Sequence, residues 1–288
     1  MPTVWIARSV SLIIMSCSYR RCIVNKWIIS LVSFVCVNCC SFAQVVLEEN
    51  VDRFAPGPYT DEQFSKQWKF VTPKALNINW AHLYGKLAVV EDDTQGKVLR
   101  IAYPEGGVGP EQTGSQFVLN LPPADEYELS FKVLFEEGFD FRLGGKLPGL
   151  TSGGEKFTGG IHPKNGEGWS ARFMWREGGT AELYLYYVDN KNEWGDQFPF
   201  DGVTLELGRW YEFRQRIRLN RPGKKDGRIQ AWLNGSKMLD LKEMRLRIGE
   251  QGPIDSFYFS TFHGGQGSEW VPRSDSYARF DDIRIEAR

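Results

Sequence analysis

Alternation of apolar and polar residues is the feature that most constrains the fold of this chain. Every second residue is apolar from Tyr127 to Phe135, and between Trp210 and Asn220 apolar side chains alternate with Glu212 and three arginines. A period of two residues is typical of strands that bury one face and expose the other. The same pattern recurs over residues 97–103, 116–121, 170–175, 181–188, 228–233, 255–262 and 277–285.

The segments between these runs are rich in Gly, Pro, Asn and Asp, and only residues 239–248 are ambiguous between a helix and a strand. Short strands without βαβ spacing favour two packed antiparallel sheets. We therefore predict an all-β fold, a β-jelly-roll sandwich. Residues 66–288 show no composition break and are predicted to form one domain. Residues 44–65, which contain Pro56-Gly57-Pro58, are predicted to be a lead-in segment outside it.

The N-terminal segment carries a targeting pattern. Residues 1–43 contain four basic residues and no acid, an apolar run from Trp27 to Val37, and Ser41-Phe42-Ala43 at a suitable cleavage position. This order is typical of a secretory signal peptide. We predict cleavage after Ala43 and a secreted or periplasmic protein that is not associated with a membrane after cleavage. A start at Met15 would give the signal a more usual length.

All five cysteines lie within the first 40 residues. A zinc site built from Cys36, Cys39 and Cys40 is the alternative to a signal peptide, but no second pair of ligands follows at metal spacing. The domain that remains after cleavage contains no cysteine, so its core must hold it together without disulfides.

The charge balance narrows the class of partner. The whole chain has a formal net charge of −1, and removing the four N-terminal cations leaves 31 basic against 36 acidic residues, a net charge of −5. Because nucleic-acid binding normally shows as a basic excess, we expect no nucleic-acid partner. Asp281 and Asp282 are interpreted as turn residues, so we predict no metal and no cofactor, and we expect a monomer.

A hairpin brings four polar side chains together. Glu177–Gly179 has the length and the glycines of a common three-residue hairpin loop. Pairing the residues that flank the loop places Arg172 opposite Tyr184 and Ser170 opposite Tyr186, on the face opposite the apolar residues. On this pattern alone, an ordinary solvent-facing sheet is the competing interpretation.

Several short motifs accompany this hairpin in a fixed order. They are Gly145-Lys146-Leu147-Pro148-Gly149, Trp169–Trp175, Tyr184-Leu185-Tyr186, Gly208–Phe213, Trp232–Gly235, Thr261–Gly265 and Arg279–Asp282. Together they resemble polysaccharide lyase family 14, which includes alginate lyases and glucuronate-cleaving lyases. The resemblance covers residues 66–288 and implies a concanavalin-like jelly roll whose cleft binds an anionic polysaccharide. It assigns catalytic roles to Lys146, Ser170, Arg172, Tyr184 and Tyr186.

These residue types suit β-elimination on a uronic acid, and we expect the substrate to be mannuronate-rich alginate. A cation on the C6 carboxylate stabilises the enolate that forms when the C5 proton leaves. We assign this role to Lys146 and Arg172, with Ser170 as a hydrogen-bond donor. Tyr184 and Tyr186 are predicted to be base and acid, because nearby cations favour the phenolate and lower the pKa of tyrosine.

Three further residues are predicted to bind substrate. His263 lies in a Gly-rich segment that could line the cleft, and Arg214 and Arg216 form a basic strand face that could extend the polymer track. A plain solvated face is the competing interpretation for the two arginines.

Other functions remain open from sequence alone. A glucuronan lyase would use the same mechanism, and a non-catalytic carbohydrate-binding domain would use exposed aromatics such as Trp194 and Trp270. A retaining glycoside hydrolase needs two closely spaced carboxylates, and no strand carries such a motif.

Overall fold

The computed structural model describes residues 43–68, 86–265 and 267–288. Residues 1–42, which hold all but the last residue of the predicted signal peptide, lie outside the described residues. Ser41–Arg288 form one compact unit. Within the described part of the chain, no helix has the length and apolar character needed to cross a membrane.

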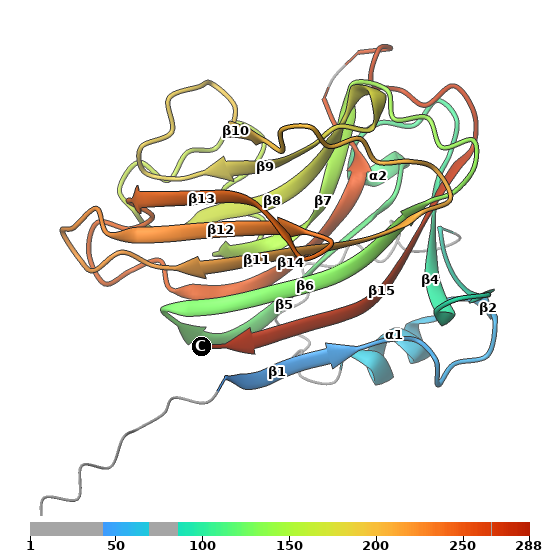
Figure 1. Cartoon of the computed structure of the whole chain (residues 1–288), viewed down its shortest axis with the longest axis horizontal. Coiled ribbons are helices and arrows are strands. Elements are labelled where there is room, and N and C mark those ends of the chain that lie inside the picture. Colours follow the sequence, from blue (N-terminus) through green and yellow to red (C-terminus); the bar gives the residue numbers. More distant parts are fainter. Residues whose placement is uncertain (1–42, 69–85, 266) are drawn as a thin grey trace, which may run out of the picture. The chain divides into compact units, whose positions relative to one another are not determined.

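Two antiparallel sheets make up this unit (Figure 1). The nine-stranded sheet has the order β13-β12-β11-β6-β15-β4-β3-β2, with β1 paired to β15. Its strands are β1 (Gln44–Glu49), β2 (Gly57–Pro58), β3 (Leu87–Asp92), β4 (Gly96–Tyr103), β6 (Glu126–Phe135), β11 (Trp210–Arg218), β12 (Gly227–Leu233), β13 (Ser236–Met244) and β15 (Ser276–Ala287). The six-stranded sheet has the order β10-β9-β8-β7-β14-β5. Its strands are β5 (Ser115–Ala124), β7 (Gly144–Ser152), β8 (Trp169–Arg176), β9 (Ala181–Tyr186), β10 (Asp196–Pro199) and β14 (Ile254–His263).

The core lies between the sheets. Phe131 of β6 and Phe213 of β11 stack with ring centroids 5.6 Å apart, and Phe131 meets Phe173 of β8 across the sandwich at 6.0 Å. All three rings are fully buried. Burying one such side chain contributes roughly 2 to 3 kcal/mol to stability. The apolar faces that the alternation creates therefore hold the two sheets together. The jelly-roll prediction is confirmed.

All nine strands predicted from alternation are present. The ambiguous segment 239–248 contributes to β13 as far as Met244. The described residues also form three short helices: α1 (Asp61–Gln67), α2 (Gly109–Gln112) and the 3-10 turn η3 (Glu177–Gly179). Gly178 and Gly179 of η3 have φ values of 68° and 77°, which glycine adopts without strain. The predicted hairpin loop therefore forms where the sequence placed it.

The segment 44–65 differs from its prediction, because it is built into the sandwich. β1 pairs with β15, and Leu47, Val51 and Phe64 are buried in the main core. In β1 the apolar residues Val45, Val46 and Leu47 are consecutive, and a register shift separates Val45 from Leu47, so the segment shows no period of two. α1 is fixed by a capping box, in which the Thr60 hydroxyl accepts from the Gln63 N–H at 3.2 Å and the Gln63 side chain accepts from the Thr60 N–H at 2.7 Å.

β7 was not predicted as a strand because its glycines hide any alternation. A Cβ at Gly145 would lie 2.0 Å from the Trp175 ring, and one at Gly149 would lie 2.0 Å from the Ala171 carbonyl oxygen. Glycine is required at both positions because β8 lies so close. The register shift between Lys146 and Gly149 makes a bulge that follows the lysine.

We expect Asp281→Asn to stabilise the protein at alkaline pH. Asp281 lies at a register shift in β15, and burial, together with Asp282 and Asp52, raises its pKa to about 7. Its unfolded pKa is about 3.9. The native state therefore keeps a proton that the unfolded state loses, and stability falls as pH rises from about 4 to 7. Asparagine removes this loss, which we put at about 1 to 2 kcal/mol after allowing for solvent screening.

Urea unfolding at pH 5 and pH 8 measures this effect. The gain should be largest at pH 8, smaller at pH 5, and nearly absent in a third measurement at pH 4, where the unfolded chain also keeps much of its proton. The control is Asp282→Asn, since Asp282 is half exposed and paired with Lys132 at 2.7 Å. An equal gain in both variants would contradict the assignment to Asp281.

Candidate active site

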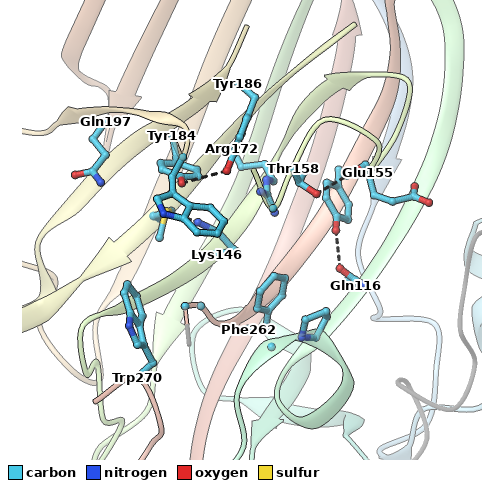
Figure 2. Close-up of a pocket in the computed structure, with 18 of the residues that line it drawn as sticks. Gln116, Lys146, Glu155, Thr158, Arg172, Tyr184, Tyr186, Gln197, Phe262 and Trp270 are labelled. Carbon is cyan, nitrogen blue, oxygen red and sulfur yellow. Dashed lines mark hydrogen bonds between the residues drawn. The ribbon is translucent and has the colours of Figure 1, made fainter. Parts of the chain in front are cut away.

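A cleft of about 700 Å³ lies on the face of the six-stranded sheet that is turned away from the core. Alternation produces this face: on β8, Ala171, Phe173 and Trp175 belong to the core cluster, whereas Arg172 and Met174 line the cleft. Figure 2 shows the side chains that converge on it. The lining residues are Gly109, Pro110, Gln116, Lys146, Glu155, Thr158, Gly159, Arg172, Met174, Arg176, Tyr184, Tyr186, Trp194, Gln197, Tyr258, Phe262, Gly264, Gly265 and Trp270.

Strand register sets the relative positions of the central groups. Ser170 pairs with Tyr186 and Arg172 pairs with Tyr184, as predicted from the hairpin. The alternative of a solvent-facing sheet is wrong, because β8 and β9 are buried on both faces apart from Arg176 at the strand end. Four of the five residues to which the resemblance gives a catalytic role line one cleft: Lys146, Arg172, Tyr184 and Tyr186.

Arg172 is a buried cation that has no carboxylate partner among the described residues. Its side chain is 2% exposed, Nη1 donates to the Ser260 hydroxyl at 3.1 Å, and Nε has no hydrogen-bond partner. Within the described chain, no carboxylate lies within ion-pair distance of Arg172. An unpaired buried charge is costly, so this guanidinium is well suited to a negatively charged ligand.

Lys146 lies beside the tyrosines and also lacks a carboxylate partner within the described chain. Its Nζ donates to the Met174 sulfur at 2.8 Å and lies 3.7 Å from the centre of the Tyr184 ring. Loss of hydration, followed by the positive charges of Arg172 and Arg176, lowers the pKa of Lys146 well below its usual value. The amine therefore reaches its neutral form more readily than an ordinary lysine.

The two tyrosines are held by main-chain groups of neighbouring loops. The Tyr184 hydroxyl accepts from the Gly195 N–H and the Tyr186 hydroxyl from the Gly160 N–H, both at 3.0 Å, and the two hydroxyls lie 3.5 Å apart. Burial raises the pKa of Tyr184 despite the opposing effect of Arg172. The expectation that the cations would lower this pKa is wrong, because loss of hydration is the larger effect.

Ser170 lies behind the cleft wall. It is fully buried, does not line the cleft, and donates to the Phe157 carbonyl oxygen at 2.6 Å. Phe157 belongs to the loop between β7 and β8, the same loop that carries Gly160. Ser170 therefore anchors the loop whose amide orients Tyr186, which is a positioning role.

The structure contradicts the substrate-binding role predicted for His263. Its ring is fully buried, stacks on Phe139 with centroids 5.6 Å apart, and contacts the Asp140 carbonyl oxygen through Nε2 at 2.7 Å. Burial lowers its pKa to about 4. The reason is strand alternation: Tyr258 and Phe262 of β14 line the cleft, and His263 points the other way.

Arg214 and Arg216 are also far from the cleft. They lie on β11 in the nine-stranded sheet, where Arg214 pairs with Glu128 at 3.5 Å and Arg216 with Glu126 at 2.6 Å. The solvated sheet face that competed with the substrate track is therefore the correct interpretation.

Sequence reasoning missed several lining residues. Gln116 accepts from the Tyr258 hydroxyl at 2.5 Å, and Gln197 pairs with Tyr184 in the register of β9 and β10. Alternation along β5 and β14 would have placed Gln116, Tyr258 and Phe262 on one face. Glu155 and Thr158 come from a loop, for which the sequence gives no periodic signal.

Comparisons with known proteins identify the family. The sequence profile of Polysaccharide lyase 14 matches residues 91–283. The structure of alginate lyase Aly36B is 25% identical, with a TM-score of 0.72 over 83% of this chain and 95% of that chain.

Two further structures share the fold. The marine PL-14 alginate lyase from Aplysia kurodai is 24% identical, with a TM-score of 0.70 over 84% of this chain and 99% of that chain. Alginate lyase vAL-1 from Chlorella virus is also 24% identical, with a TM-score of 0.60 over 70% of this chain and 89% of that chain. No protein with a curated function matches the sequence significantly. The chain belongs to polysaccharide lyase family 14 and is a polysaccharide lyase.

Proposed function

We propose that this enzyme cleaves alginate, preferentially in mannuronate-rich stretches, by β-elimination. The observation that carries the proposal is the buried, uncompensated guanidinium of Arg172 in the cleft. A polyuronate supplies one carboxylate per sugar, which is the counter-charge that Arg172 lacks among the described residues. The likeness to alginate lyase Aly36B supports alginate over other polyuronates.

In this mechanism Arg172 binds the C6 carboxylate and stabilises the enolate that forms next to it. The neutral amine of Lys146 accepts the C5 proton, for which its lowered pKa and its position at the cleft wall suit it. This division of roles differs from the one expected from sequence, in which lysine only neutralised charge and a tyrosine was the base. A buried tyrosine with a raised pKa is a poor base but keeps its proton.

We assign the proton donor for the O4 leaving group to the tyrosine pair. Each hydroxyl already accepts a main-chain N–H, so its own proton is available for donation. The elimination breaks the C5–H and C4–O4 bonds, forms the C4–C5 double bond and places the donated proton on O4.

Absorbance near 235 nm, which reports the unsaturated product, tests the substrate. The mature enzyme should produce it fastest from polymannuronate, more slowly from polyguluronate, and not from a neutral glucan. A faster reaction on glucuronan would assign the same mechanism to glucuronan. New reducing ends without absorbance would contradict the elimination.

We expect Tyr184→Phe and Tyr186→Phe to lower kcat by unequal factors, with about 100-fold or more for the true donor. Either variant should leave KM nearly unchanged, since the ring remains in place. A substrate with a good leaving group shows which tyrosine is the proton donor. An aryl uronide needs no protonation of its leaving group, so the variant that lacks the donor should cleave it at nearly the wild-type rate. Full activity of both variants on the polymer would remove the tyrosines from the mechanism.

We also propose that the enzyme is exported, on the basis of the N-terminal signal pattern. N-terminal sequencing of the protein recovered outside the cytoplasm should begin at Gln44.

A further inference from the structure

An ion pair lies next to the proposed base and has no role in the mechanism so far. Lys146, Met174 and Glu182 occupy one cross-strand row over β7, β8 and β9, because Lys146 pairs with Met174 and Met174 pairs with Glu182. Glu182 is 4% exposed and is bound by Arg176 at 2.9 Å. A buried carboxylate thus lies beside the cleft of an enzyme whose proposed substrate is a polyanion, bound to Arg176 of the cleft wall.

The elements around this row supply few other charges. β14 places Phe262 opposite Lys146, and β10 places Pro199 opposite Glu182, so neither adds a titratable group. The titratable and charged side chains that face the row are Lys146, Arg172, Arg176, Glu182 and Tyr184. With Arg172 reserved for the substrate carboxylate, the remaining charges that act on Lys146 are those of the ion pair.

We propose that the Arg176–Glu182 ion pair sets the pH range of the enzyme by fixing the net charge next to Lys146. The proposal rests on the proposed function of Lys146 as the base. Both members of the pair are positioning residues, since they act through Lys146 rather than on the substrate.

The two members act in opposite directions. The carboxylate of Glu182 favours the ammonium form of Lys146 and raises its pKa, whereas the guanidinium of Arg176 favours the neutral amine and lowers it. Because the two are bound to each other, their effects on Lys146 largely cancel. Removing one member leaves the other uncompensated in a poorly hydrated site, where one charge shifts a neighbouring pKa by about one unit.

The test compares Glu182→Gln with Arg176→Gln. The acid limb of kcat/KM reports the base of the free enzyme. It should move down by about one pH unit in Glu182→Gln and up by about one unit in Arg176→Gln. The double variant should return close to wild type. If the ion pair were merely structural, Glu182→Gln and Arg176→Gln would change the acid limb in the same way. Shifts of the acid limb with the same sign, or no shift, would therefore overturn the proposal.

Matched controls come from the other sheet. Glu126→Gln and Arg216→Gln remove the same charges from an ion pair of 2.6 Å that lies away from the cleft, and their acid limbs should coincide with that of the wild type. If a single variant of the cleft pair fails to fold, the exchanged pair R176E/E182R keeps the bond and moves the cation into the row of Lys146. Its acid limb is then expected at lower pH, and a limb at higher pH would overturn the proposal.

A second readout separates this proposal from the role of Lys146. In enzyme labelled with ¹³C-lysine, the Lys146 signal is identified by its loss in Lys146→Met, and its titration gives the pKa without catalysis. Opposite shifts of this pKa with an unmoved acid limb would support the ion-pair effect and overturn Lys146 as the base. Equal or absent shifts of the pKa would overturn the ion-pair effect itself.

Discussion

Replacing Lys146 with methionine is expected to lower kcat on polymannuronate by about 1,000-fold, within the range that a positioned general base contributes. Methionine keeps the length and the apolar stem of the side chain but cannot accept a proton. Binding should change little, because the carboxylate is held by Arg172. Initial rates at 235 nm give kcat and KM, and the acid limb of the remaining activity should lose its dependence on the pKa of Lys146.

The control for this variant is Lys156→Met. Lys156 is exposed, lies 4.9 Å from the Phe157 ring and does not line the cleft, so its loss should leave kcat within about twofold. The variant Lys146→Ala adds a chemical test, since it leaves room for a small amine. Added methylamine should restore part of the rate, and a Lys146→Met enzyme with more than a tenth of wild-type kcat would contradict the base assignment.

Replacing Arg172 with methionine is expected to lower kcat/KM by about 100- to 1,000-fold, the usual cost of losing one group that stabilises a developing anion. The expected cause is the loss of the positive charge with which Arg172 neutralises the C6 carboxylate. A methyl-esterified polymannuronate separates this cause from general damage, because the ester carries no charge to neutralise. The variant should therefore lose much less activity on the ester than on the acid.

The same variant should unfold at equal or higher urea concentration than the wild type. The guanidinium is buried with an unsatisfied Nε and no carboxylate partner in the described chain, and an apolar side chain of similar volume removes that cost. Arg214→Met on the opposite sheet is the control, and its activity should be unchanged. Equal losses on ester and acid would show that Arg172 acts on something other than the substrate charge.

The hairpin shows how far the sequence alone can lead. The period of two and the glycines of residues 177–179 were sufficient to predict that Arg172 faces Tyr184 and that Ser170 faces Tyr186, because register follows from loop length. Register says which residues share a face, however, and not what covers that face. Ser170 shares the face of Arg172 but is covered by the loop that contains Phe157.

The errors have the same physical origin. His263 ends a strand whose two faces both carry aromatic and small polar residues, so composition could not tell the cleft side from the core side. The pKa values of Lys146 and Tyr184 depend on how much water the tertiary structure removes. That quantity has no local signature in the sequence, and it is the reason why we propose other roles for these two groups than charge alone assigned to them.

The amides of Gly160 and Gly195 have a consequence for how such an enzyme can diversify. They orient the tyrosine hydroxyls from two surface loops through main-chain groups, which every residue except proline carries. Most side chains of these loops, including the half-exposed Trp194, can therefore be exchanged without removing either hydrogen bond. Substrate preference and the chemical step are thus separable properties of the same loops, and a library that randomises them while keeping both glycines should yield altered specificity at undiminished turnover.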